Sequence, residues 1–252
     1  MRRTSTRRVG YLDFENFRKL PIKEFKEISF HGWGEPFLHP QLFKMIDYAH
    51  SFGVKTSLIT NGTLLEKRMN ELLESKLDSI AFGIFTLEGK DKILKSIERL
   101  VKVKNKRGLN LEVWVDITIT GWNLNEIPRI VKFAGEVGID GVVLHRLFTL
   151  HDPSLNKPSL IDEVRACMSA KRVGKDHRVK IYCPPIRIRP CRVALMTMFI
   201  SWDCRVSPCC FLCEMGHYTC NALDESFNKI LELHRRFLGE MKRNEICKRC
   251  PW

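Results

Sequence analysis

The first 166 residues of the sequence contain no cysteine, although the whole chain of 252 residues contains ten. The first is Cys167, and the other nine all lie between Cys183 and Cys250. The chain therefore has two chemically different parts. A disulfide framework would be expected in a secreted protein, whereas reduced cysteines gathered in one region are better explained as metal ligands or buried thiols.

Long apolar runs are also missing. No segment approaches the ~20 apolar residues that a membrane-spanning helix needs, and the longest obvious run, residues 193–200, is far too short. The basic stretch MRRTSTRR is not followed by the apolar segment of a secretory signal. These absences favour a cytoplasmic protein without a membrane partner.

Acidic residues are fewer than basic ones: the chain has 29 Asp and Glu residues and 42 Lys and Arg residues, which gives a formal net charge of +13. Such a balance favours acidic partners in general, including nucleic acid, phosphorylated cofactors and acidic peptides. A basic surface without a specific anion explains it equally well. The length and the 44% hydrophobic content suit one domain, or one large domain with a small one.

Five short segments rich in Val, Ile, Phe and Thr predict strands, at residues 27–31, 54–60, 78–85, 111–119 and 139–148. Four amphipathic helical patterns lie between them, beginning near residues 42, 65, 93 and 127. This alternation predicts an α/β fold with a parallel sheet and a ligand site beyond the carboxyl ends of its strands.

We expect three parts in the chain. Residues 1–150 would form a partial parallel barrel, residues 151–182 a turn-rich and basic connector, and residues 183–252 a small cysteine-rich domain. A further amphipathic helix is predicted from Phe227 to Met241, and we expect His234 on its apolar face to be a packed core histidine.

The segment FHGWGEPFLHP follows the first predicted strand. Gly32 and Gly34 would let the backbone approach a ligand closely, and Glu35, followed by Pro36, can accept hydrogen bonds from an ammonium group. The segment Thr60-Asn61-Gly62 follows the second strand, at the same edge of the sheet. A tight turn with a solvated glutamate explains the spacing equally well.

Two Cys-x-x-Cys pairs, Cys210/Cys213 and Cys247/Cys250, form the clearest metal signal. A pair at this spacing can direct both sulfurs at one metal atom or cluster. With Cys191, the pairs exceed the four thiolates that one site needs, and their number allows zinc or an iron–sulfur cluster. For the isolated residues, Cys167, Cys183 and Cys220, we expect ordinary buried thiols.

Two of these motifs together resemble one family. ISFHGWGEPFLHP is similar to the G-x-G-E-P motif of radical S-adenosylmethionine (radical SAM) enzymes, and SWDCRVSPCC with the later CKRC resembles the auxiliary cluster domain of the SPASM and twitch subfamilies. LITNG and the alternating strands and helices match the partial barrel of that family. The resemblance covers essentially the whole chain.

The resemblance implies two cofactor sites. Glu35 would contact the methionine ammonium of S-adenosylmethionine, with Gly32, Gly34 and Pro36 shaping the approach. An auxiliary [4Fe–4S] cluster would be held by the thiolates of Cys191, Cys209, Cys247 and Cys250. Cys210 or Cys213 could take the place of Cys209.

The sequence departs from the family in two places. It has no C-x-x-x-C-x-x-C motif and no strand to carry one, and SIAFGIFT has Gly83 and Phe85 where family members often have a polar S-x-D pair. Residues 1–20 resemble the segment after the third cysteine of that motif. We therefore expect an N-terminally shortened radical enzyme that cannot cleave S-adenosylmethionine as written, with residues 27–31 as an exposed sheet edge. The DNA upstream of Met1 would test this.

The first functional hypothesis is a radical SAM enzyme that modifies a peptide or an enzyme cofactor, with a peptide or protein substrate and an electron donor as partners. The second is a non-catalytic iron–sulfur binding or electron-transfer module. The third, a zinc-stabilised nucleic-acid binder, ranks last because no element interleaves aromatic residues with Lys and Arg. No general acid or base stands out, since capping and packing explain His31, His39 and Asp116 equally well.

Overall fold

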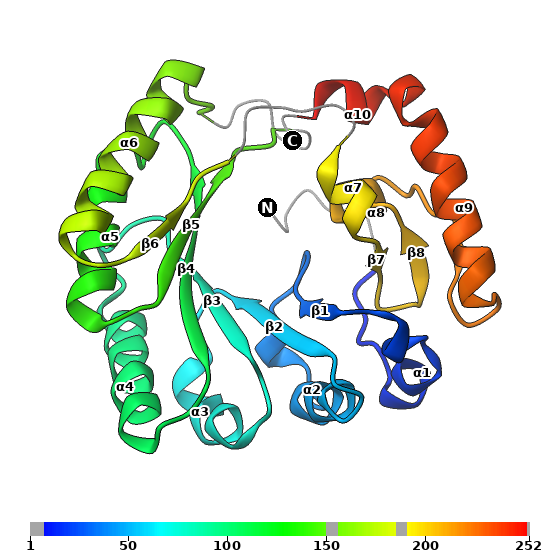
Figure 1. Cartoon of the computed structure of the whole chain (residues 1–252), viewed down its shortest axis with the longest axis horizontal. Helices are drawn as coiled ribbons and strands as arrows, with labels where there is room; N and C mark the ends of the chain where they lie inside the picture. Colours follow the sequence, from blue (N-terminus) through cyan, green and yellow to red (C-terminus); the bar gives the residue numbers. More distant parts are fainter. Residues whose placement is uncertain (1–7, 150–155, 185–190, 251–252) are drawn as a thin grey trace.

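The computed structural model describes residues 8–149, 156–184 and 191–250. A curved parallel sheet has the strand order β1-β2-β3-β4-β5-β6, and a small antiparallel sheet has the order β7-β8-β9 (Figure 1). The strands are β1 Glu27–Phe30, β2 Lys55–Thr60, β3 Ser79–Gly83, β4 Glu112–Ile119, β5 Gly141–Arg146, β6 Lys180–Tyr182, β7 Phe199–Ile200, β8 Arg205–Ser207 and β9 Cys220–Asn221.

Helices cover the outer, convex side of the large sheet and flank the small one (Figure 1). The α-helices are α1 Phe14–Lys19, α2 Leu42–His50, α3 Leu65–Glu74, α4 Asp91–Arg107, α5 Glu126–Val137, α6 Leu160–Asp176, α7 Arg192–Met196, α8 Cys210–Glu214, α9 Phe227–Glu240 and α10 Glu245–Arg249. The short 3-10 helices are η2 Ile22–Glu24, η3 Pro36–Leu38 and η4 Met241–Arg243.

The five predicted strands and the four helices between them are confirmed, and neighbouring strands pair in parallel. Strand β1 is the outermost strand of the sheet within the described residues, so its outer edge is unpaired there, as expected for residues 27–31. The carboxyl ends of all these strands meet at one rim, which brings the loops after β1 and β2 together.

The two faces of the large sheet differ sharply, as β4 shows. Its residues alternate with the period of two that a strand imposes. The side chains on the convex face have no exposed surface: Val113, Val115, Ile117 and Ile119. Those on the concave face are at least partly exposed and mostly polar: Glu112, Trp114, Asp116 and Thr118. The concave face is therefore open to a ligand.

Residues 151–182, expected to be a connector, contain more structure than the sequence predicted. Ser159 caps the start of helix α6, because its side chain accepts a hydrogen bond from the Asp162 amide. Strand β6 pairs with β5 as a sixth parallel strand. The helix faces the sheet with small residues, Ala166, Ala170 and Gly174. The outer face carries exposed apolar residues: Leu160, Ile161, Val164 and Met168. Because the larger apolar residues of α6 are exposed and its buried residues are small, the sequence lacks the amphipathic pattern by which a helix is usually predicted. The division into three parts stays a prediction.

The cysteine-rich region is attached to the start of the chain through a shared core. Phe14 and Phe17 of α1 and Met45 of α2 are buried in one cluster with Val206 of β8 and Ile230 of α9. Packing therefore holds the region beside β1 and α2 (Figure 1). The packed role of His234 is confirmed, because its buried ring lies 2.6 Å from the Ala194 carbonyl oxygen.

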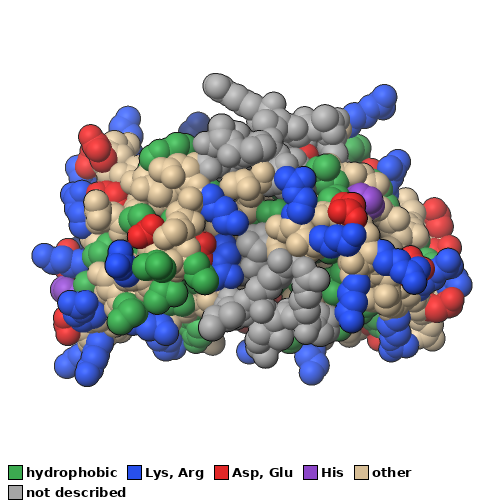
Figure 2. Space-filling model, turned by 90° about the horizontal axis from the view of Figure 1, so that it is seen from above, with side chains coloured by type: hydrophobic (Ala, Val, Ile, Leu, Met, Phe, Trp, Pro, Cys, Tyr) green, Lys and Arg blue, Asp and Glu red, His purple; other side chains and the backbone are tan. Residues whose placement is uncertain are grey.

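Lys and Arg side chains are scattered over the face seen in Figure 2 rather than gathered over one element. On this face, the net charge of +13 does not mark a single anion-binding patch. Among the residues that the structure describes, no helix combines the length and the apolar character needed to cross a membrane.

Candidate functional site

Glu35 joins the ends of β1 and β2. Its Oε1 atom accepts hydrogen bonds from the Thr60 hydroxyl (2.7 Å) and the Phe37 amide (3.0 Å), and its Oε2 atom accepts one from the Asn61 amide (2.9 Å). A carboxylate has about four lone-pair positions, so three hydrogen bonds orient Glu35 and leave capacity for one more donor. The half-buried carboxylate therefore fits an ammonium group.

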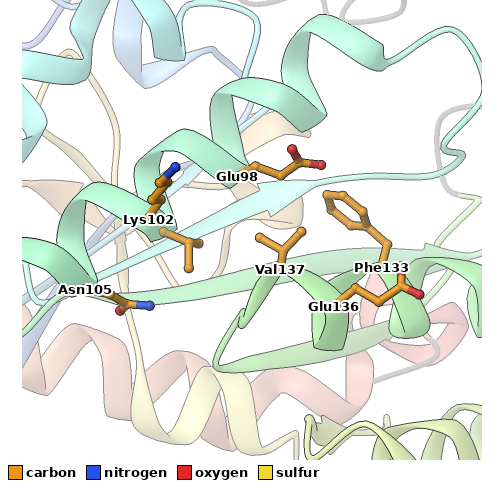
Figure 3. A pocket seen from close by; sticks show the side chains of 7 residues that line it. Glu98, Lys102, Asn105, Phe133, Glu136 and Val137 are labelled. Atoms are coloured by element: carbon orange, nitrogen blue, oxygen red, sulfur yellow. The ribbon is translucent and has the colours of Figure 1, made fainter.

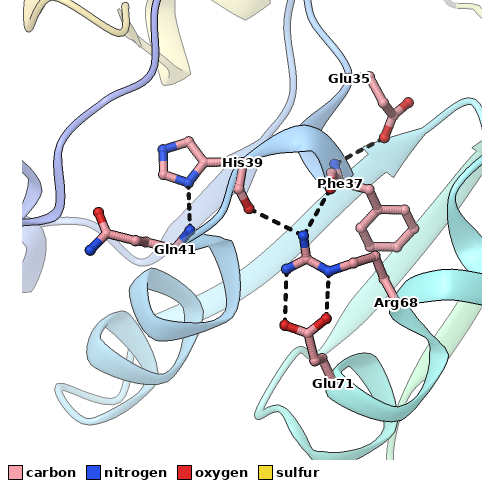
Figure 4. A network of polar contacts seen from close by, with 6 residues as sticks. All are labelled: Glu35, Phe37, His39, Gln41, Arg68 and Glu71. Carbon is pink, nitrogen blue, oxygen red and sulfur yellow. Dashed lines mark hydrogen bonds and ion pairs between the residues drawn. The ribbon is translucent and has the colours of Figure 1, made fainter.

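The backbone around Glu35 is held from outside. Arg68 donates to the carbonyl oxygens of Phe37 (2.9 Å) and His39 (3.4 Å) and forms an ion pair with Glu71 (Figure 4). His39 accepts at Nδ1 from the Gln41 amide (3.1 Å), so its Nε2 atom donates to the Leu12 carbonyl 2.8 Å away. Partial burial lowers the pKa of His39 below its ordinary value. The neutral ring is thus the form that fits.

The glycine loop contacts the cysteine-rich region. Gly32 has a φ of +147°, and a Cβ atom there would lie 3.1 Å from the ring of Phe199. Trp33 donates from Nε1 to the Cys210 carbonyl oxygen at 3.0 Å. At Gly34 no atom lies within 4 Å of the position that a Cβ would take, and Pro36 begins η3 with Glu35 as its N-cap. The loop therefore leaves open space over Gly34.

A cavity of about 620 Å³ lies along the concave face of the large sheet. Its lining includes Ser29 of β1, Ser57 of β2, and Asp116 and His145 of β4 and β5. The Asp116 Oδ2 and His145 Nε2 atoms are 2.8 Å apart, and His145 lies near the carboxyl end of β5. Sequence reasoning left the role of Asp116 open and missed His145, although the polar residues at alternate positions of β4 were a visible signal.

A second pocket, of about 450 Å³, lies between α4 and α5 (Figure 3). It is lined by side chains such as Lys102 of α4 and Phe133 of α5. Because these helices cover the convex side, this pocket is separated by the sheet from Asp116 and His145. Its position gives it no part in the site at the strand ends.

Cys209 is the best-formed anion site among the described cysteines. It is the N-cap residue of α8, where it makes no side-chain cap hydrogen bond, and the nearby backbone amides of Phe211 and Leu212 favour its thiolate. Burial raises the pKa of the Cys209 thiol, the amides oppose that rise, and neighbouring Cys191 and Cys213 add to it. Nearby amides and other thiols are surroundings that suit a thiolate ligand of an iron–sulfur cluster, so Cys209 is a candidate ligand of such a group.

The four expected cluster ligands are only partly gathered. Cys191 and Cys209 lie close enough to influence one another, whereas Cys247 lies in α10 and Cys250 directly follows it. No group of three or more Cys, His, Asp or Glu residues in the described ranges is close enough to hold a metal ion. The ligand set therefore stays a prediction. Burial raises the pKa of Cys210 to about 12, which makes it a poor thiolate without a metal.

Two protein families match the chain. The radical SAM superfamily matches residues 14–134, and the SPASM family, described as an iron–sulfur cluster-binding domain, matches residues 191–251. The first segment contains the loop with Glu35, and the second contains Cys191, Cys209 and both Cys-x-x-Cys pairs. These families imply S-adenosylmethionine and iron–sulfur clusters as cofactors.

Curated relatives match part of the chain. The chain is 26% identical over 165 residues to a tungsten-containing aldehyde ferredoxin oxidoreductase cofactor-modifying protein of Pyrococcus furiosus, covering 58% of this chain and 46% of that protein. It is 30% identical over 123 residues to a probable GTP 3′,8-cyclase of Pyrococcus abyssi, covering 44% and 38%. The chain thus spans about half the length, or less, of these relatives.

Solved structures share the fold. SuiB of Streptococcus suis bound to the precursor peptide SuiA matches with a TM-score of 0.69 and 16% identity, covering 89% of this chain and 60% of SuiB. Native anSMEcpe with bound AdoMet and the Cp18Cys peptide matches with a TM-score of 0.67 and 16% identity, covering 96% and 80%. These likenesses confirm the fold class. The chain therefore contains a radical SAM domain over residues 14–134 and a SPASM iron–sulfur cluster-binding domain over residues 191–251.

Proposed function

We propose that this chain binds S-adenosylmethionine at the Glu35 loop and an auxiliary [4Fe–4S] cluster at the cysteine-rich region, as part of a radical enzyme that modifies a peptide or an enzyme cofactor. The observation that carries the proposal is the contact between the two regions. Trp33 hydrogen-bonds to the Cys210 backbone, and Gly32 lies against Phe199. Both cofactors would then face the same concave space.

Glu35 would hold the methionine ammonium of S-adenosylmethionine. Its orientation by Thr60 and Asn61 supports this role, because a preset carboxylate loses little freedom when the ligand binds. Gly32 and Gly34, with Pro36, would shape the approach. The open space over Gly34 supports a close passage of the ligand along the backbone.

Cys191, Cys209, Cys247 and Cys250 would hold the auxiliary cluster. The closeness of Cys191 to Cys209 and the amides around Cys209 support two of the four ligands. Cys213 remains the alternative to Cys209, since it is buried beside it. When bound, the cluster would engage substrate or relay electrons, and an electron donor would be a partner of the protein.

The radical-generating cluster is a different case. The segment that matches the radical SAM superfamily, residues 14–134, contains no cysteine, so its residues do not fit that cluster. We propose that these 252 residues alone produce no 5′-deoxyadenosine. A cytoplasmic location remains part of the proposal, supported by the many thiols assigned to reduced, metal-binding roles.

A peptide is the favoured substrate class. Two structural neighbours were solved with peptides, and the open concave face offers polar side chains, including the Asp116–His145 pair, that could hydrogen-bond to one. A cofactor precursor is the alternative, supported by the cofactor-modifying relative from Pyrococcus furiosus. Equilibrium binding of a short unstructured peptide to the protein saturated with S-adenosylmethionine would separate these two classes. Binding of the peptide supports a peptide substrate, and its absence supports a cofactor precursor.

The first test is equilibrium binding of S-adenosylmethionine to anaerobically reconstituted protein. Glu35→Gln should weaken binding by about tenfold, the effect of losing one charged hydrogen bond. The matched control is Glu232→Gln, at an exposed position of α9, which should leave the affinity unchanged. Equal affinities for wild type and Glu35→Gln would remove Glu35 from the site.

A second candidate function is a non-catalytic iron–sulfur module, favoured by the lack of cysteines before Cys167. The two functions separate in one experiment. Bound iron together with S-adenosylmethionine binding supports the radical-enzyme assignment, whereas bound iron without such binding supports the module. Formation of 5′-deoxyadenosine by this chain alone would contradict our proposal that it lacks the cleavage step.

A further inference from the structure

Cys167 and Cys183 form a thiol pair outside both proposed cofactor sites. Cys167 lies in α6 and Cys183 directly follows β6, and these two elements pack closely enough that a Cβ on Gly174 would meet Ile181 at 2.5 Å. The Cys183 sulfur is 4.0 Å from the Cys167 carbonyl oxygen, and the two thiols hydrogen-bond to each other. The sequence had suggested two isolated buried thiols. The fold instead brings them together.

Both thiols are half-buried at the margin of the main core. This position holds them side by side and still leaves access for a small molecule. Packing between α6 and β6 places the two residues next to each other. Of the ten cysteines, these two are the farthest upstream and precede Cys191, the first expected cluster ligand.

The environment makes the two sulfurs unequal. The hydrogen bond from the Cys167 thiol lowers the pKa of Cys183 to about 7, and Lys171, one turn along α6, adds to this effect. The same hydrogen bond and burial raise the pKa of Cys167. At neutral pH about half of the Cys183 thiol is therefore ionised, while Cys167 stays protonated. A thiolate is the nucleophile in disulfide exchange, and a protonated neighbour can act as the resolving thiol.

We propose that Cys167 and Cys183 are a redox-modification site that closes to a reversible disulfide by exchange with a small disulfide such as oxidised glutathione. The Cys183 thiolate attacks one sulfur of the small disulfide, forming a mixed disulfide and releasing one thiolate. Cys167 then loses its proton, attacks the Cys183 sulfur and releases the second thiol. Two electrons pass from the pair to the small disulfide, which is reduced to two thiols.

The bond would join α6 covalently to the end of β6, the last strand of the sheet. This strand has only three residues, and its pairing with β5 covers the same short stretch. Closing the pair should therefore slow local opening of β6. The inference does not depend on S-adenosylmethionine or iron binding, so either proposal can fail without the other.

The test uses the whole reduced chain incubated anaerobically with oxidised glutathione, blocked with iodoacetamide and mapped by mass spectrometry without reductant. The expected product is a linked peptide pair containing Cys167 and Cys183, which disappears after dithiothreitol. Cys220→Ser is the control variant and should give the same linked product. Glutathione that remains on Cys183 without resolution, or no reaction at either residue, would overturn the proposal.

Two substitutions of Cys167 separate its roles. Cys167→Ser keeps a hydrogen-bond donor and removes the resolving sulfur, so Cys183 should accumulate the mixed disulfide while its alkylation still rises through a pH of about 7. Cys167→Ala removes the donor as well, and alkylation of Cys183 at neutral pH should then fall roughly tenfold, toward an ordinary thiol. Identical alkylation profiles in wild type and Cys167→Ala would contradict the pairing.

Discussion

Strand β4 of the large sheet buries four apolar side chains with no exposed surface, whereas the strands of the cysteine-rich region are only two or three residues long. The large sheet owes its stability to the burial of alternating residues beneath helices α2 to α6. The cysteine-rich region has short elements and shares its core with α1 and α2.

This difference teaches that the two regions depend on different forces. A sheet packed by apolar residues is complete without a cofactor. A region with short strands and many thiols gains much of its order from a metal centre, because metal binding and folding are coupled. Variants that remove apolar contacts should therefore act on the sheet, and variants that remove thiolates should act on the cysteine-rich region.

The largest effect should follow replacement of a cluster ligand. Cys209→Ala should remove most of the bound iron after anaerobic reconstitution and increase hydrogen exchange in residues 191–250, while exchange in β2 to β5 stays unchanged. Cys220→Ser, at a thiol not assigned to the cluster, should retain the iron. Full iron content in Cys209→Ala, together with its loss in Cys213→Ala, would transfer the ligand role to Cys213.

The next largest effect should come from the buried ion pair between Arg146 of β5 and Glu163 of α6, 2.6 Å apart. Glu163→Ala should reduce the free energy of unfolding by about 3–5 kcal/mol, because it leaves a charge without this partner in a buried position. Urea unfolding measures this change. The double variant Arg146→Leu/Glu163→Leu should recover most of the loss, and failure to do so would show that packing rather than charge explains the result.

A cavity in the sheet core should cost slightly less and leave the cluster intact. Ile117→Ala should lower the free energy of unfolding by about 2–5 kcal/mol, since Ile117 has no exposed surface. Lys95→Ala, on the exposed side of α4, should change it by less than about 0.5 kcal/mol. Loss of iron from Ile117→Ala would contradict the view that the two regions depend on different forces, because it would show that they unfold as one cooperative unit.

The smallest effect should be a pH dependence at His39. Its pKa is lowered in the folded protein, so the unfolded chain binds a proton more readily. Stability from the neutral ring is complete above a pH of about 6.5 and is lost as the pH falls through the lowered value. We expect a loss of less than about 1 kcal/mol, because solvent screens a half-buried group.

Urea unfolding of wild type and His39→Gln between pH 7 and pH 5 measures this contribution. The variant should show a flatter dependence on pH over this range. A steeper dependence in the variant would mean that His39 is charged in the folded state, and the hydrogen bond from the Gln41 amide to Nδ1 would then be assigned wrongly.

The sheet could be predicted from sequence because its strands and helices follow simple periods. Val113, Val115 and Ile117 alternate along one strand, and Leu65, Met69 and Leu72 recur with the spacing of a helix. Helix α6 escaped prediction because it packs through Ala and Gly and exposes Val164 and Met168. Small residues give little periodic signal even where they allow close packing.

The candidate site could be predicted only in part. Glu35 was found from its glycine loop, but its hydrogen bonds with Thr60 and Asn61 depend on adjacent strands. The pairs Asp116–His145 and Cys167–Cys183 are likewise formed by residues distant in sequence. The order of cysteines along the chain identifies a metal-binding region, whereas the choice among neighbouring thiols is made by three-dimensional packing.

The most direct test of the account is the iron and acid-labile sulfide content of anaerobically reconstituted protein, measured together with its Mössbauer spectrum. The account predicts a single [4Fe–4S] cluster per chain that is lost when Cys191 is replaced by alanine. Protein that takes up zinc but no sulfide, or that retains its cluster in Cys191→Ala, would contradict it.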